Sequence, residues 1–123
     1  MEKELILSTL PKTWIFDLDG TILKHNGYKV DGIDTLLDGA KEYIDAIPKD
    51  DYILILTSRT EGYRDMTIRF LQNNQIRYDK ILFNIPMGER IIINDQKPSG
   101  LDMAVAVNIR RNKFYIPSLR REL

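Results

Sequence analysis

Residues 13–21 read TWIFDLDGT, and this stretch decides the fold. Residues 14–16 are apolar and rich in β-forming side chains, so they predict a buried strand. Two acids, Asp17 and Asp19, follow with one residue between them, and a glycine and a threonine come next. Open α/β proteins bind their ligands at the carboxyl edge of the sheet. A pair of carboxylates at such an edge suits a divalent cation and a phosphate far better than it suits a core.

Composition places the chain among ordinary globular proteins. Its 123 residues have the size of one domain, expected over residues 1–123 with a core at about 13–108 and a basic tail at 109–123. Eighteen basic residues balance eighteen acidic ones, so nothing favours nucleic acid or an anionic membrane as partner. The absence of cysteine excludes disulfides, thiolate catalysis and cysteine-based zinc sites. No signal peptide or membrane-spanning stretch is evident, which predicts a cytoplasmic location.

Strands and helices are predicted to alternate along the chain. The predicted strands cover residues 13–17, 52–56, 80–84, 90–94 and 104–108. An Asn-Gly turn signal predicts a small hairpin over residues 24–30. Strands as uniformly apolar as these are typical of parallel sheets, and their alternation with helices implies right-handed crossovers. We therefore expect an α/β fold, namely a three-layer, Rossmann-like parallel sheet with helices on both faces.

Two helices are predicted from apolar residues at helical spacing. The first covers about residues 33–47, with Asp31 or Asp34 as its cap. The second covers about residues 62–73, and its buried side is predicted to hold Tyr63, Met66, Phe70 and Leu71. For the basic tail, the favoured interpretation is a solvated and partly disordered terminus, and the alternative is a contact with a partner subunit or an anionic substrate.

Polar residues follow three of the predicted strands. Asp17 and Asp19 follow the first strand, residues 57–59 (Thr-Ser-Arg) follow the second, and Asn94 and Asp95 follow the fourth. Because the carboxyl ends of parallel strands share one edge of the sheet, these side chains are expected to converge. Mg²⁺ takes oxygen ligands, commonly one or two carboxylates together with substrate phosphate. The pattern therefore predicts a Mg²⁺ and phosphate site at this edge.

This order of motifs resembles the haloacid dehalogenase (HAD) superfamily of phosphatases over roughly residues 13–108. The resemblance implies that Asp17 is the nucleophile that becomes an aspartyl phosphate, and that Asp19 protonates the leaving group and then activates water. It also implies a Mg²⁺ site formed by Asp17, Asp19 through its backbone carbonyl, and Asp95. Covalent catalysis of this kind splits one difficult step into two easier ones. The residues implied to bind substrate or phosphate are Leu18, Gly20, Thr57, Ser58, Arg59 and Arg90.

One position departs from the family pattern. The lysine expected after the third strand is replaced by Ile85. Lys80, Arg90 and Lys97 are the nearby cations that can substitute for it, and Lys97 is preferred as a catalytic residue because it lies just beyond Asp95. If none of them reaches the site, the protein is a slow or inactive relative.

The spacing between the motifs leaves no room for a cap domain. The resemblance therefore implies a small, capless member, whose open site accepts a bulky substrate or is closed by a neighbouring subunit of a homo-oligomer. Balanced charge favours a small phosphorylated metabolite, such as a sugar or polyol phosphate, over nucleic acid.

Other readings of the same residues stay open. One is a non-catalytic relative that keeps the metal and phosphate pocket, and the replacement by Ile85 motivates it. Another is a receiver-like signalling domain, which the spacing of Asp17 and Asp19 disfavours. The single histidine, His25, is interpreted as an exposed turn residue, with substrate contact as the alternative.

Overall fold

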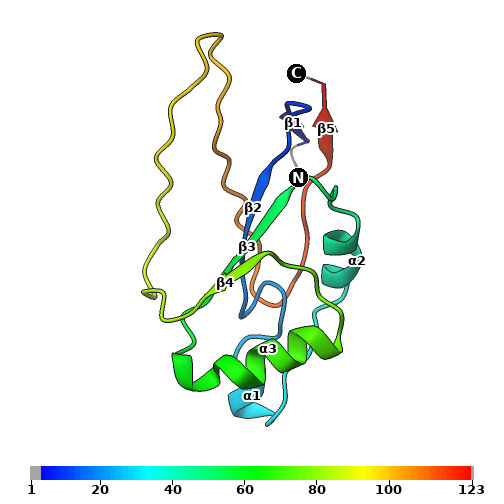
Figure 1. Ribbon diagram of the computed structural model, residues 1–123, viewed down its shortest axis with the longest axis vertical. Coiled ribbons are helices and arrows are strands. Elements are labelled where there is room, and N and C mark those ends of the chain that lie inside the picture. Colours follow the sequence, from blue (N-terminus) through cyan, green and yellow to red (C-terminus); the bar gives the residue numbers. More distant parts are fainter. Residues whose placement is uncertain (1–3, 123) are drawn as a thin grey trace.

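A computed structural model describes residues 4–122 of the chain and has an α/β fold built on parallel strands (Figure 1). The elements in chain order are β1 (Leu5–Leu7), β2 (Thr13–Asp17), α1 (Gly27–Val30), α2 (Ala40–Asp45), β3 (Tyr52–Leu56), the 3-10 turn η1 (Glu61–Tyr63), α3 (Arg64–Asn73), β4 (Lys80–Leu82) and β5 (Leu119–Arg121). None of the helices in the described part of the chain has the length and apolar character needed to cross a bilayer.

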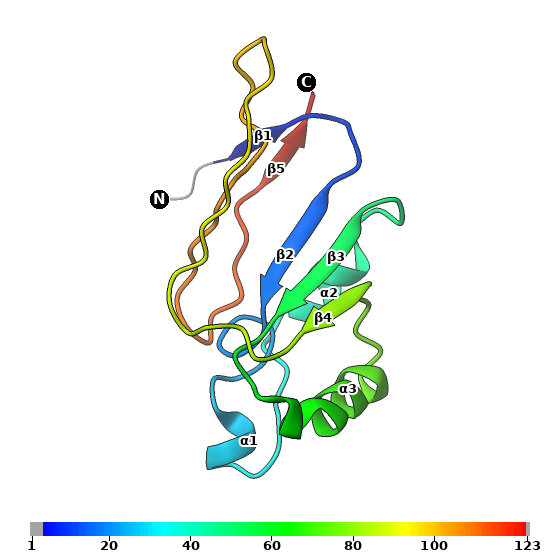
Figure 2. The same cartoon turned by 60° about the vertical axis from the view of Figure 1, so that its left-hand side comes forward.

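The central sheet has three parallel strands in the order β2-β3-β4. Its strands are the predicted apolar runs, and the register places Phe16 beside Ile55 and Ile55 beside Ile81. Two crossovers through helices connect these strands, as the alternating sequence pattern predicts. This arrangement is compatible with a Rossmann-like fold and brings the carboxyl ends of β2 and β3 to one edge of the sheet (Figure 2).

The core lies against one face of this sheet. Phe16, Ile53 and Ile55 are buried there together with Ile44 of α2 and Leu71 of α3. An edge-to-face contact of Trp14 with Tyr43 joins α2 to this face, and the guanidinium of Arg64 over the Phe83 ring joins the start of α3 to it. The opposite face keeps Ile15 exposed. Within residues 4–122, a second helical layer on that face is therefore not observed.

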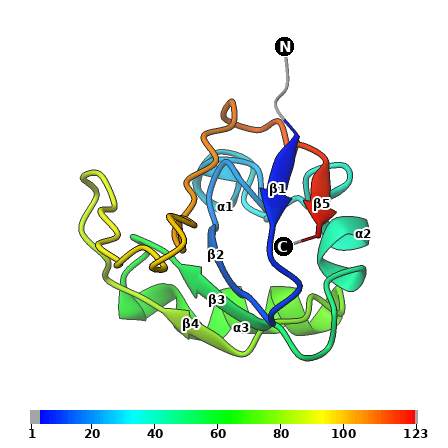
Figure 3. The same cartoon turned by 90° about the horizontal axis from the view of Figure 1, so that it is seen from above.

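A second sheet was not predicted from the sequence. Strands β1 and β5 pair in parallel, with Leu5 beside Leu119, and Figure 3 shows them away from the three-stranded sheet. Phe114, which precedes β5, packs on Phe16 and Tyr43. The expectation of a partly disordered tail is therefore wrong, because its apolar residues pack against the core and against the first strand.

Local predictions near the site also need correction. Residues 24–30 form no hairpin; Asn26 adopts a left-handed conformation with φ of 55°, and its carbonyl accepts the amides of Lys29 and Val30 to start α1. Helix α2 begins at Ala40 after Gly39, which has φ of 86°, so neither Asp31 nor Asp34 caps it. The predicted second helix is present as η1 and α3. Its buried residues are Thr67 and Leu71, whereas Tyr63 and Met66 are exposed.

The predicted strands at 90–94 and 104–108 are not formed. Residues 86–108 instead form a long two-limbed excursion, called the arm below, which runs past the β1–β5 pair (Figures 1 and 2). The same apolar pattern that predicts a strand is present, but β propensity mostly reflects packing against neighbouring strands. Among residues 4–122, no strand pairs with either of these two runs.

Candidate functional site

Asp17 ends β2 and is followed by a tight turn that points its backbone into a cleft. The carbonyl of the buried Leu18 accepts hydrogen bonds from the amides of Ile22 and Leu23, at 3.0 Å each. Gly20 has φ of +86°, a conformation that side chains other than glycine rarely adopt, and a Cβ there would approach the Arg111 side chain to 3.1 Å. The glycine of the motif is therefore required by backbone geometry and by crowding.

The Asp17 carboxylate has two polar partners. The Thr21 hydroxyl donates to its Oδ2 at 3.1 Å, and Arg90 Nη1 donates to its Oδ1 at 2.9 Å. The side chains of Asp17 and Arg90 are 36% and 35% exposed, so this ion pair stays open to solvent and to a ligand. Arg90 is therefore the cation that faces Asp17. It comes from the base of the arm, 73 residues further along the chain.

Asp19 is fixed by a buried arginine. Arg59 Nε and Nη2 bond the two oxygens of Asp19 at 3.1 and 2.8 Å, and the same guanidinium bonds both oxygens of Asp34 at 3.0 and 2.7 Å. It also donates to the hydroxyl of Thr67 and lies 3.9 Å from the centre of the Tyr28 ring. Arg59 is only 3% exposed, so it is not a surface charge. It is a buried residue that holds the Asp19 side chain in place.

The electrostatics of Arg59 follow from these contacts. Burial lowers the pKa of its guanidinium, but hydrogen bonds and ion pairs with Asp34 and Asp19 raise it by more, so the net shift is upward. Arg59 therefore stays charged, and its fork geometry matches carboxylates. Each oxygen of Asp19 accepts one hydrogen bond from this guanidinium.

Thr57 and Ser58 lie between these two acids and β4. Thr57 is buried, its hydroxyl accepts the amide of Arg59 at 3.1 Å, and its carbonyl accepts the amide of Ile85. Ser58 lines the cleft. The structure thus brings together six predicted residues as lining of one cleft, with the buried Thr57 next to Ser58 in the chain. They are Asp17, Asp19, Gly20, Ser58, Arg59 and Arg90.

The cleft has a volume of about 510 Å³ and a basic lining. Its lining includes His25, Lys29, Arg59, Arg90 and Arg111 together with Asp17 and Asp19. The amide of His25 donates to the Asn112 side chain at 2.7 Å, and its buried Nδ1 has no protein partner in the described structure. His25 thus lies in a turn, as predicted, but it is half-buried and lines the cleft. An anionic ligand such as a phosphate ester suits this set of charges.

Two predicted residues are not at this cleft. Asp95 and Lys97 lie near the tip of the arm, where the amide of Gly100 donates to the Lys97 carbonyl. The prediction that Asp95 lies close to Asp17 is therefore wrong for a single copy. The prediction that Lys97 faces Asp17 is wrong for the same reason. Among residues 4–122, no group of three or more His, Asp or Glu side chains is close enough to hold a metal ion. Lys80, the third candidate cation, lies at the start of β4 and away from the carboxyl edge.

Sequence reasoning missed the partner of Asp34. Arg111 belongs to the basic tail, for which contact with an anionic substrate was the alternative interpretation, and it lines the cleft. Asp34 looked like a helix cap, whereas it pairs with Arg59 over a separation of 25 residues. The one available signal was an acid among apolar residues at 33–37, and that pattern does not name its partner.

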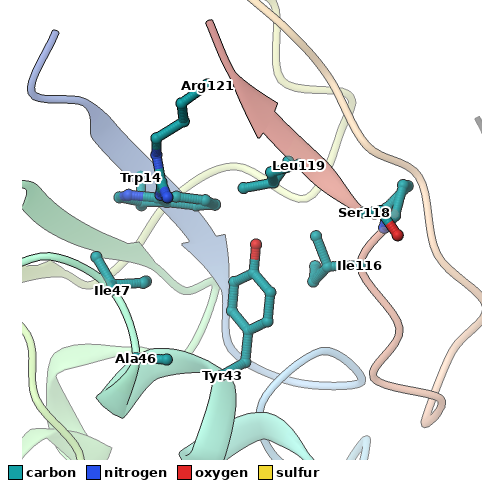
Figure 4. Close-up of a pocket in the computed structure, with 9 residues that line it drawn as sticks. Trp14, Tyr43, Ala46, Ile47, Ile116, Ser118, Leu119 and Arg121 are labelled. Atoms are coloured by element: carbon teal, nitrogen blue, oxygen red, sulfur yellow. The ribbon is translucent and has the colours of Figure 1, made fainter. Parts of the chain in front are cut away.

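Another pocket, of about 260 Å³, lies beside β5 and α2 (Figure 4). Its lining is Trp14, Tyr43, Ala46, Ile47, Ile116, Pro117, Ser118, Leu119 and Arg121. The buried Tyr43 hydroxyl points toward the space between Trp14 and Leu119 and has no hydrogen-bond partner in the described structure. No acid lines this pocket, so it lacks the groups for the chemistry predicted above.

Two solved structures are similar to this chain. A chain of the structure titled "Structure of Pnkp1/Rnl/Hen1 complex" superposes with a TM-score of 0.53 and 31% identity, over 68% of this chain and 31% of that one. A chain of the Pnkp1/Rnl/Hen1 RNA repair complex gives the same TM-score with 32% identity, over 68% and 29%. The chain thus spans about a third of the length of the chains that it matches. Neither a protein-family model nor a curated protein matches it.

Proposed function

We propose that the protein is a capless HAD-type phosphatase that hydrolyses phosphomonoesters through an aspartyl phosphate on Asp17. The observation that carries this proposal is the position of Asp17. It ends β2 at the carboxyl edge of the sheet, stays partly exposed and lines a cleft that also holds Lys29, Arg90 and Arg111. A nucleophile for phosphorus needs this combination of access and positive surroundings.

The proposed reaction has two steps. A carboxylate oxygen of Asp17 attacks phosphorus, the bond from phosphorus to the ester oxygen breaks, and the leaving alcohol takes a proton from Asp19. Water then attacks the aspartyl phosphate, Asp19 accepts its proton, and inorganic phosphate leaves. Arg90 contacts Asp17 at 2.9 Å and is placed to offset the charge of the transferring phosphoryl group. Arg59 orients Asp19.

Mg²⁺ belongs to the proposal through the HAD resemblance, but one copy of the chain does not fit it fully. The Asp17 carboxylate is paired with Arg90, and the third acid of the resemblance, Asp95, lies in the arm. We therefore assign no step to the metal. When bound, Mg²⁺ neutralises phosphoryl charge.

For the substrate, we propose a small phosphorylated metabolite such as a sugar or polyol phosphate, handled in the cytoplasm. A phosphorylated RNA end is the second candidate, and the likeness to chains of an RNA repair complex favours it. The basic cleft suits either one, because both present a phosphomonoester.

Phosphate release from a panel tests the proposal. The panel contains sugar phosphates, polyol phosphates and oligoribonucleotides with a 3′ or 5′ phosphate, each with and without Mg²⁺. Replacement of Asp17 by Asn removes the nucleophile, so we expect turnover to fall by at least about a thousandfold. Asp45→Asn, on the outer side of α2, is the matched control and should keep wild-type turnover.

Wild-type turnover by Asp17→Asn would contradict the assignment of the nucleophile. The alternative function, a non-catalytic binding protein, would be favoured by calorimetric binding of Mg²⁺ or phosphate without turnover of any panel member.

A further inference from the structure

The arm is unusually apolar for a segment in water. Of residues 86–108, every one except Leu101 is exposed. Ile91 and Ile93 are 82% and 93% exposed, and Met103, Val105 and Val107 are also exposed. The backbone hydrogen bonds within the arm are confined to its tip, between Lys97 and the residues that follow it. A long, β-branched segment with an unsatisfied backbone is a template for pairing with another strand.

The central sheet has an open edge that such a segment fits. The amide of Tyr52 donates to the carbonyl of Lys12, so the alternation of a parallel ladder turns even-numbered residues of β2 toward β3. The backbone groups of Thr13, Ile15 and Asp17 therefore face the other edge of β2. Among the described residues, no backbone hydrogen bond from another segment reaches these three. Ile15 itself is 46% exposed.

We infer that the arm of a second copy of this chain pairs with the open edge of β2, and that two copies exchange arms in a symmetric dimer. The run at residues 90–94 has the five-residue length of β2, and both surfaces belong to the same chain. A surface that is complementary to another surface of its own chain closes with two-fold symmetry when the exchange is reciprocal. Pairing satisfies the backbone of both strands and covers the arm's isoleucines.

The arm of the same copy cannot make this contact in the same way. Arg90 is held at the carboxyl end of β2 by its ion pair with Asp17. Extended chain advances about 3.3 Å per residue, so Asp95 of that copy lies roughly 17 Å further along. While Arg90 contacts Asp17, its own Asp95 cannot reach the same carboxylate. An arm from a second copy has no such restriction.

The exchange has a consequence for the site, and this step rests on the proposed function. If the second copy's residues 90–94 run parallel to β2, as β3 does, their carboxyl end lies at the edge that holds Asp17. Asp95 of the partner subunit then supplies the third acid that one copy lacks. Each active site would thus contain Asp17 and Asp19 of one copy and an acid of the other.

Sedimentation and cysteine cross-linking test the interface without any assay of activity. We expect a dimer for the full chain, and a monomer with an unchanged far-ultraviolet spectrum for Ile91→Asp combined with Ile93→Asp. If Asp17 is level with the second copy's Asp95, Ile15 is level with its Ile93, and adjacent parallel strands bring such Cα atoms within disulfide range. The chain has no cysteine of its own. Mixing Ile15→Cys with Ile93→Cys under oxidation should therefore give a covalent heterodimer.

The matched control replaces Ile93→Cys by Ile92→Cys, whose side chain points to the opposite face of the strand and should not link. A monomeric wild-type chain would overturn the inference. So would a disulfide within one chain when Ile15→Cys and Ile93→Cys are combined in one molecule, because the arm would then fold back on its own sheet.

Complementation separates the interface from the chemistry. Asp17→Asn and Asp95→Asn should each be inactive alone, whereas random exchange makes half of the dimers mixed, each with one intact site. Activity should therefore return to about a quarter of the wild-type value. No recovery from an active wild type would overturn the shared site. A dimer that cross-links as expected but has no activity on any substrate would instead contradict the proposed function alone.

Discussion

Two regions depart from the rule that polar side chains are exposed and apolar ones buried. They are the cluster of Arg59, Asp34 and Thr67, called the Arg59 cluster, and the arm. Arg59, Asp34 and Thr67 are polar and fully enclosed, and each has hydrogen-bond partners inside the chain. Ile91 and Ile93 are apolar and are exposed to solvent. In the cluster, hydrogen bonds and ion pairs within one copy of the chain offset the free-energy cost of burying the polar side chains. In the arm, the exposed apolar side chains indicate packing against a surface that the described residues of one copy do not provide.

The largest expected effect is on the buried cluster. Arg59→Met leaves the carboxylates of Asp34 and Asp19 without their partner, and breaking a buried ion pair from one side costs about 3–5 kcal/mol. We expect the free energy of unfolding in urea to fall by that amount. Arg69→Met is the control, because Arg69 is exposed on α3, and it should leave the unfolding midpoint unchanged. A midpoint unchanged by Arg59→Met would contradict the structural role of the cluster.

The next effect contrasts the core with the arm directly. Leu71→Ala creates a cavity under the sheet and should lower the free energy of unfolding by about 2–5 kcal/mol. Ile91→Ala, measured at a dilution where the chain is monomeric, should change it by no more than about 0.5 kcal/mol, because Ile91 buries little in one copy. A comparable loss for both variants in the dilute sample would mean that the arm packs within its own copy.

The smallest effect concerns Tyr43, whose buried hydroxyl has no hydrogen-bond partner among residues 4–122. Tyr43→Phe removes an unsatisfied polar group and should raise the free energy of unfolding by about 1 kcal/mol. Burial raises the pKa of Tyr43, and Arg121 lowers it by less. Because the folded state holds the proton more tightly, the wild type should lose stability as pH rises above about 10, the ordinary tyrosine pKa.

Urea titrations at pH 8 and pH 11 check the sign for Tyr43. The wild type should lose more stability between these two values than Tyr43→Phe does. An equal loss in both proteins would mean that another group accounts for the change.

The sequence predicted the structure well where a segment makes its hydrogen bonds and apolar contacts within itself or with the adjacent strand. The runs at 13–17 and 52–56 are apolar throughout, and both are strands at the predicted residues. The second helix and the strand beginning at Lys80 were also predicted, because helical spacing and a short β-rich run admit few alternatives. Asp17 and Asp19 follow β2 at the predicted edge for the same reason.

The sequence was uninformative where a residue's partner is distant. Residues 90–94 have the pattern of a strand, yet a strand needs a neighbour to pair with, and none is found for them in the described part of one copy. Arg59 was equally consistent with a surface charge, because Asp34 and Tyr28 come from another part of the chain. The cation beside Asp17 was assigned to Lys97, whereas a contact across 73 residues gives that place to Arg90.

Local pattern and backbone sterics were enough to predict strands β2 and β3 and the pair of acids at the end of β2. Only the tertiary structure decided that Arg59 anchors Asp19, that Arg90 faces Asp17, and that the arm leaves the sheet open at β2. Those outcomes depend on which distant segments meet, and a charge or an apolar run in the sequence carries no record of its partner.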